Sequence, residues 1–185
     1  WFSFATAIHL LVTVSAGGPL HYDLGGWAPP WGIAYRIDLL GAYVLLIVTA
    51  IAALVMVFAR RSVALEIPAE RTARFYAAVL LAFAGLAGIV VTGDAFNVFV
   101  FLEISSLASY ALISQGPSPR ALTSALQYLV MGTIGATFIL VGIGLLYMMT
   151  GTLNMVDMAD RLMRQADFVV SPGDAGPQGG AEDAA

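Results

Sequence analysis

The run LLGAYVLLIVTAIAALVMVFA, residues 39–59, contains no charged side chain and decides the fold class of this protein. A helix that crosses the hydrocarbon core of a bilayer needs about 20 consecutive apolar residues, which this run supplies. Arg60 and Arg61 follow it directly and stop the apolar pattern. The run therefore predicts a transmembrane helix.

Other apolar runs lie on both sides of this segment. Three of spanning length follow toward the C-terminus, at residues 75–92, 95–114 and 121–149. The Gly93-Asp94 turn and QGPSPR (115–120) separate them. Residues 1–14 are apolar but short, and we interpret them as the back end of a helix whose start is missing, because the basic region of a signal peptide is absent. The expected fold class is an all-α polytopic transmembrane helix bundle with about five spans, the first incomplete.

The composition excludes several classes of protein. Hydrophobic residues make up 59% of the 185 residues and charged residues 11%, whereas a soluble domain has about 25% charged residues. The net charge of −4 argues against a nucleic-acid partner. The chain has no Cys, and His9 and His21 lie far apart without metal-ligand spacing. We expect no catalytic residue, no metal site and no cofactor in this chain.

The loops and the tail predict the organisation around the membrane. Residues 1–155 are expected to form the transmembrane domain, and residues 156–185 an extramembrane, largely disordered tail that ends in SPGDAGPQGGAEDAA. The loop before residue 39 carries Gly25-Gly26, which favours a short hairpin. Five of the eight basic residues, all arginines, fall in two loops that we place on the cytoplasmic side: Arg60, Arg61, Arg71, Arg74 and Arg120. The expected location is the cell membrane, with Asp94 and the tail on the outer side.

Glu103 is the one acidic residue inside the expected spans. It is the ninth residue of the 95–114 span, about 13 Å from either surface, where an ionised carboxylate is most costly. Ser106 and Tyr110 follow on the same helical face and predict a polar seam around it. Such a carboxyl can serve as a proton or cation relay, because burial in hydrocarbon disfavours its charged form. The alternative is structural: a neutral Glu103 that hydrogen-bonds a neighbouring helix.

Two further polar residues are candidates for the ion path. Gln127 lies in the next span at a depth similar to that of Glu103, and a direct or water-mediated contact between them would be compatible with the short connection between the spans. A purely interhelical hydrogen bond is the alternative role for Gln127. Asp94 precedes the Glu103 span and is well placed as its N-cap, with guidance of cations as a second role.

Three stretches of the sequence resemble a known family. The run GDAFNVFVFLEISSLASYALIS (93–114) is similar to the antiporter-like membrane subunits, which comprise Mrp-type multisubunit cation/proton antiporter subunits and the proton-pumping subunits of respiratory NADH:quinone oxidoreductase. The run ALQYLVMGTIGATFILVGIGLLYMMTGTLNM (125–155) resembles the next part of these subunits. GGWAPPWGIAYRID (25–38) looks like their outer loop, and together with TGTLNM it leans toward the D-like branch of the Mrp antiporter subunits.

The resemblance implies roles for single residues. A buried Glu of the ion path falls on Glu103, and the family's basic residue on the next helix, usually Lys, falls on the neutral Gln127. Family members continue beyond TGTLNM into a broken helix with a Lys-Pro type centre, which nothing in residues 156–185 resembles. We therefore expect the chain to be the front portion of such a subunit.

The expected function is that of a membrane subunit, as a fragment, of a multisubunit monovalent cation/proton antiporter that moves protons through Glu103. The alternative is a proton-translocating subunit of a respiratory NADH:quinone oxidoreductase or membrane hydrogenase complex. Without Cys for iron–sulfur ligation the chain cannot carry electrons itself. The expected partners are the lipid bilayer, other subunits of the complex, protons and, as a candidate, Na⁺.

Overall fold

The computed structural model describes residues 1–27 and 32–170. These residues form helices and one hairpin in the order α1 (Phe2–Gly17), β1 (Leu20–Asp23), η1 (Leu24–Gly26, a 3₁₀ turn), β2 (Ala34–Ile37), α2 (Leu39–Glu66), α3 (Ala69–Val91), α4 (Ala95–Ser114), α5 (Pro119–Thr150) and α6 (Met155–Val170). Four of the helices, α2 to α5, are long and apolar enough to cross a membrane, and α1 is a shorter apolar helix. The expected all-α polytopic architecture is confirmed, and the protein is a multi-pass membrane protein.

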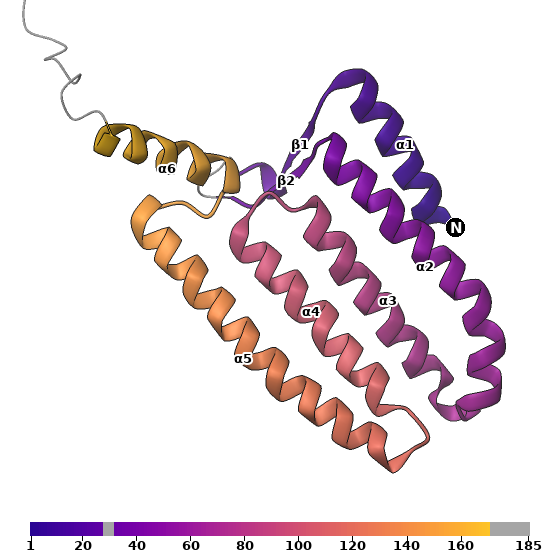
Figure 1. The fold of residues 1–185 in the computed structure, drawn as a ribbon. Helices are drawn as coiled ribbons and strands as arrows, with labels where there is room; N and C mark the ends of the chain where they lie inside the picture. The colour runs from indigo at the N-terminus through magenta and orange to yellow at the C-terminus, as the bar shows by residue number, and fades with distance from the viewer. Residues whose placement is uncertain (28–31, 171–185) are drawn as a thin grey trace, which may run out of the picture.

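Helices α1 to α5 lie side by side in an open layer, in which each packs mainly against its neighbours in the chain (Figure 1). Only 6% to 17% of the most apolar 18-residue windows of α2 to α5 is buried inside the protein. Their outward-facing side chains are nevertheless apolar, as in helices that meet lipid or other membrane helices. Hydrocarbon replaces water as the solvent of these surfaces, so their exposure carries little cost.

Two glycines of α3 allow α4 to approach closely. A Cβ atom at Gly85 would lie 2.7 Å from the backbone nitrogen of Ser105 and 2.8 Å from the carbonyl oxygen of Phe101. A Cβ at Gly88 would overlap the ring of Phe101. Gly85 therefore holds α3 against the backbone of α4, and Gly88 leaves room for the ring of Phe101.

Backbone hydrogen bonds tie together the end of the layer at which the hairpin lies. The Gly93 N–H donates to the Ala34 carbonyl at 2.9 Å, which joins the α3–α4 turn to the hairpin. The Ala95 N–H donates to Leu153 O at 2.8 Å, and the Met155 N–H donates to Gly93 O at 3.0 Å. We call these contacts the hairpin-end hub. Through it β2 and the segment after α5 both bond to the short turn before α4.

The hairpin expected around Gly25-Gly26 is confirmed. β1 and β2 pair antiparallel, with Leu20 opposite Ile37 and Asp23 opposite Ala34. Gly25 and Gly26 have φ values of 67° and 75°, in the left-handed region that favours glycine. Residues 28–31 of the connection lie outside the described residues.

Helix α2 continues beyond the expected span end at residue 59. It passes through Arg60 and Arg61 and ends at Glu66, two residues before Pro68. Arginine and alanine are good helix formers, so charge ends the apolar pattern without ending the helix, whereas Pro68 restricts the residue before it and helices rarely extend across such a site. The extra turns carry Arg60 and Arg61 beyond the apolar part of α2.

Residues 155–170 form a helix where the sequence analysis placed the start of a largely disordered tail. The helix is amphipathic, and its apolar Met158 is only 6% exposed. Its N-terminus is capped by Asn154, whose Oδ1 accepts from the N–H groups of Val156 at 3.1 Å and Asp157 at 3.2 Å. Residues 171–185, with the low-complexity end, lie outside the described residues.

Arg161 fastens α6 to the end of α5. Its Nη1 donates to Thr150 O at 2.9 Å, one of the carbonyls that a helix C-terminus leaves unpaired, and the guanidinium pairs with Asp157 at 3.0 Å. Gln165 Nε2 donates to Met149 O at 3.3 Å in the same turn of α5. The hydrogen bond from Arg161 holds the pKa of Asp157 below its ordinary 3.8, so this pair is lost only as the pH falls through that lowered value.

Substitution of Gly85 by Ala is expected to lower stability by about 1–3 kcal/mol, because the new methyl group meets backbone atoms of α4 that cannot rotate away. The measurement is thermal unfolding of the purified protein in detergent. Gly135→Ala on α5 is the matched control, since a Cβ there meets no atom within 4 Å. Equal melting temperatures for the two variants would contradict the close contact of α3 and α4.

Replacement of Arg161 by Ala is expected to loosen α6 from α5, because the Thr150 carbonyl and Asp157 both lose their partner. Amide hydrogen exchange of residues 155–166 should become about fivefold faster. The exposed Arg164, changed to Ala, serves as the control and should leave this exchange nearly unchanged. If both variants accelerate exchange equally, overall charge rather than the Arg161 contacts holds α6.

Candidate functional site

The start of α4 is built by a network of short polar side chains. Asp94 Oδ1 accepts from the Asn97 N–H at 2.8 Å, which confirms the expected N-cap. Asn97 Nδ2 in turn donates to Thr92 Oγ1 at 3.1 Å. Asp94, Asn97 and Thr92 are all buried at the hairpin-end hub. Asp94 therefore fixes where α4 begins and, with it, the depth of every residue further along.

Glu103 is the ninth residue of α4 and is half-buried. The side of α4 that packs on α3 carries Phe101 and Ser105, which meet Gly85. Glu103 lies two residues from each of them, a rotation of about 200° around the helix, so it projects from the opposite side of α4. That side is the one that turns toward α5. No hydrogen bond reaches the Glu103 carboxylate from residues 1–27 or 32–170.

Tyr110 lies in the seam between α4 and α5. Its ring centroid is 5.7 Å from that of Tyr128, and its hydroxyl lies where a Cβ at residue 132 would stand, so a larger side chain than that of Gly132 would displace it. Ser106 is half-buried one turn away on the same side of α4. Glu103, Ser106 and Tyr110 thus form one polar strip along α4, of which Tyr110 contacts α5 directly.

Gln127 is not brought to Glu103. The antiparallel helices place Ser114 level with residues 122–123 and Leu107 level with Leu129, which puts Glu103 level with about residue 133. Gln127 lies six residues from that level, or about 9 Å along the axis.

The rotation of α5 also separates the two residues. Ala125 and Leu129 face α4, and Gln127 lies between them, about 200° around the helix from each. The side chain of Gln127 is exposed, and no hydrogen bond joins it to Glu103 within the residues that the structure describes. Gln127 therefore belongs to the outward-facing side of α5.

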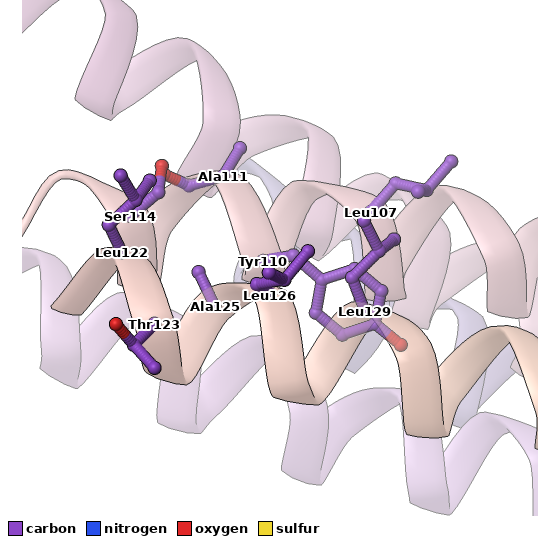
Figure 2. A pocket seen from close by; sticks show the side chains of 9 residues that line it. All are labelled: Leu107, Tyr110, Ala111, Ser114, Leu122, Thr123, Ala125, Leu126 and Leu129. Carbon is purple, nitrogen blue, oxygen red and sulfur yellow. The ribbon is translucent and has the colours of Figure 1, made fainter. Parts of the chain in front are cut away.

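A groove of about 500 Å³ lies between α4 and α5, on the Arg120 side of Glu103 (Figure 2). Figure 2 shows Ser114 and Thr123 near one end and Tyr110 with Leu107 and Leu129 near the other. Its walls are mostly apolar: Leu107, Tyr110, Ala111, Ser114, Leu122, Thr123, Ala125, Leu126 and Leu129. Such a lining suits hydrocarbon better than water or ions.

Tyr128 and Arg161 are contacts that the sequence analysis missed. Tyr128 adjoins Gln127, but sequence spacing does not give the rotation of α5 that turns its ring to Tyr110. Arg161 had a local signal, since Asp157 precedes it by one helical turn, whereas its bond to Thr150 depends on how α6 folds back. In the described residues, no group of three His, Asp or Glu side chains is placed to hold a metal ion.

Comparisons with known proteins agree with this architecture. Residues 92–171 match the family model described as NADH:quinone oxidoreductase/Mrp antiporter, transmembrane. The N-type subunit of the NADH-quinone oxidoreductase of Desulforudis audaxviator is 47% identical over 153 residues, which cover 83% of this chain and 30% of that protein. The D-type subunit of the Na(+)/H(+) antiporter of Bacillus subtilis is 36% identical over 155 residues, with coverage of 83% and 30%.

A solved structure shows the same arrangement of helices. It is that of the membrane-bound sulfane sulfur reductase, an archaeal respiratory membrane complex, with a TM-score of 0.78 and 34% identity over 85% of this chain and 32% of the other. The chain spans about 30% of the length of the relatives that it matches. By its sequence and its fold, the chain is similar to the membrane subunits of the NADH:quinone oxidoreductase and Mrp antiporter family, whose model its residues 92–171 match.

Proposed function

We propose that this chain forms part of a membrane subunit of a multisubunit monovalent cation/proton antiporter, in which Glu103 takes up and releases the proton. The relatives include a D-type subunit of a Na(+)/H(+) antiporter, and Glu103 is the carboxylate that lies among the apolar residues of α4. The single observation that carries the proposal is this half-buried acid with no hydrogen-bond partner in the described residues. A buried acid with no structural partner is costly and marks a functional site by default.

The geometry of α4 supports a proton path along one side of the helix. Ser106 and Tyr110 follow Glu103 toward the Arg120 end, and a hydroxyl can both accept and donate a proton. At Tyr110 the polar strip reaches α5, where the Tyr110 ring contacts the ring of Tyr128. In this proposal Glu103 exchanges protons with the Arg120 end through the seam between α4 and α5, in which Tyr110 lies.

Gln127 and Asp94 receive other roles in the proposal. Gln127 projects from the outward side of α5, where its amide can hydrogen-bond another helix or subunit of the complex. Asp94 is 8% exposed and serves α4 as its N-cap, which favours a structural role over the guidance of cations. We also assign residues 1–155 to the transmembrane domain, with the lipid bilayer, other subunits, protons and Na⁺ as partners.

A respiratory membership is the second candidate. It is favoured by the 47% identity to an NADH-quinone oxidoreductase subunit of type N and by the structural similarity to a respiratory membrane complex. Glu103 would move protons in both cases, but the driving force would be electron transfer in partner subunits. Co-purification with a peripheral redox arm supports this candidate, whereas co-purification with small antiporter subunits supports the first.

Replacement of Glu103 by Gln is expected to abolish cation-dependent proton flux, because an amide cannot bind and release a proton at accessible pH. Flux is measured with a pH-sensitive dye in membrane vesicles that contain the complete complex. Glu70→Gln, in the exposed first turn of α3, removes an equal charge and should leave flux unchanged. Unaltered flux in a folded Glu103→Gln protein would remove Glu103 from the mechanism.

The carboxyl stretching band of Glu103 is expected to change when a cation gradient drives proton flux through the complex, because the proposed role requires its carboxyl to gain and lose a proton. Infrared difference spectra with and without the gradient measure this band, and its loss in the Glu103→Gln variant assigns it. A band that stays constant under both conditions would identify Glu103 as a permanently neutral hydrogen-bond donor. The structural alternative would then be correct.

A further inference from the structure

We propose that the Arg120 end of α3, α4 and α5 binds an anionic phospholipid, with the phosphate held by Arg71 and Arg74 and one acyl chain in the α4–α5 groove. The site does not use Glu103, but its groove is lined in part by Tyr110, which the proposed proton path also uses. It is assigned from two adjoining cavities, from the charges at this end of the layer and from one buried amide oxygen.

The first cavity supplies the charge. It has a volume of about 360 Å³ and lies between the start of α3 and the end of α4, where its walls are Arg71, Arg74, Ala78, Ala111, Ser114 and Gln115. Neither arginine forms an ion pair in the described part of the chain, although Glu66 and Glu70 lie nearby in sequence. Two unpaired guanidinium groups on one cavity suit a phosphate, whose oxygens match the donor fork of arginine.

The second cavity supplies the apolar part of the site. It is the groove of about 500 Å³ in Figure 2, and it shares Ala111 and Ser114 with the first cavity. From Ser114 to Leu107 it follows α4 for seven residues, or about 10 Å, into the apolar part of the layer. A molecule with an anionic head and a hydrocarbon tail can therefore occupy both cavities at once.

The electrostatics of this end favour an anionic lipid over a zwitterionic one. The ends of α2, α3 and α5 that meet here carry five arginines and two glutamates. The arginines are Arg60, Arg61, Arg71, Arg74 and Arg120, and the glutamates are Glu66 and Glu70. A cytoplasmic leaflet with anionic lipids attracts such a surface. The lipid is the favoured source of phosphate, because a free anion would leave the apolar groove unfilled.

Gln115 adds a preference for the headgroup. Its Oε1 atom is buried and accepts no hydrogen bond in the described residues, while its Nε2 donates to Ala111 O at 3.4 Å. A buried acceptor without a donor is unfavourable. The Gln115 side chain lines the cavity that the phosphate occupies, so a rotation of its amide would let a headgroup hydroxyl, such as those of phosphatidylglycerol, donate to this oxygen.

The test is native mass spectrometry of the purified full chain, titrated in detergent with equal amounts of phosphatidylglycerol and phosphatidylcholine. The wild-type chain should retain phosphatidylglycerol preferentially. The double variant Arg71→Ala/Arg74→Ala should reduce that preference on the order of tenfold. The matched control is Arg60→Ala/Arg61→Ala, which removes the same charge at the same end. Arg60 and Arg61 line a different cavity, next to Trp1 and Tyr76. This control should keep the preference.

A second variant and a competitor separate the remaining outcomes. Ala111→Leu narrows the junction of the two cavities and should weaken retention of both lipids, and circular dichroism checks that each variant is folded. Inorganic phosphate at millimolar concentration should not displace the lipid. An equal loss with both arginine pairs, an unchanged preference in the Arg71/Arg74 variant, or displacement by phosphate would each overturn the proposal.

Discussion

The arrangement of these helices depends on one constraint: in a bilayer, moving an apolar side chain from lipid to another helix gains little free energy, because the lipid tails are themselves apolar. Helices in a membrane must therefore be held by close packing and by hydrogen bonds rather than by the hydrophobic effect. The protein meets this requirement in two places. Gly85 lets α3 touch the backbone of α4, Gly88 makes room for the Phe101 ring, and Gly132 admits Tyr110 between α4 and α5. At the end where the hairpin lies, backbone hydrogen bonds join the hairpin, the α3–α4 turn and the segment after α5.

This construction leaves the layer open, and the open layer determines the surroundings of Glu103 and Gln127. Glu103 projects from the side of α4 away from α3, where the described residues bring no partner for its carboxylate. Gln127, the neutral counterpart of the family's basic position, turns outward on α5. The relatives are subunits of an NADH-quinone oxidoreductase and of a Na(+)/H(+) antiporter, and in the proposed complex Gln127 is a polar group that a partner subunit would meet.

The fold could be predicted from the sequence because spans depend on composition and local signals. The apolar runs, the capping Asp94 and the paired glycines Gly25 and Gly26 each act within a few residues of the chain, and each prediction was confirmed. The rotation of α5, which brings Tyr128 to Tyr110, could not be predicted, since it depends on packing between helices and not on spacing within one helix. The position of α6 was missed because it also depends on a contact between helices, the bond from Arg161 to the end of α5.

The hairpin-end hub also decides how the helices can tilt. Within the described residues, α4 is fastened at its first residues through Asp94 and packs on α3 at Gly85, while its far end leads into the short turn at residues 115–118. Any rocking of α4 together with α3 would therefore pivot near Asp94, with Gln115 about 32 Å from the pivot and Glu103 about 14 Å. If the Arg120 end of α4 moves sideways, the Glu103 carboxylate moves in the same direction by a little under half that distance. The pivot thus converts a large displacement near the loops into a small, graded one at the acid.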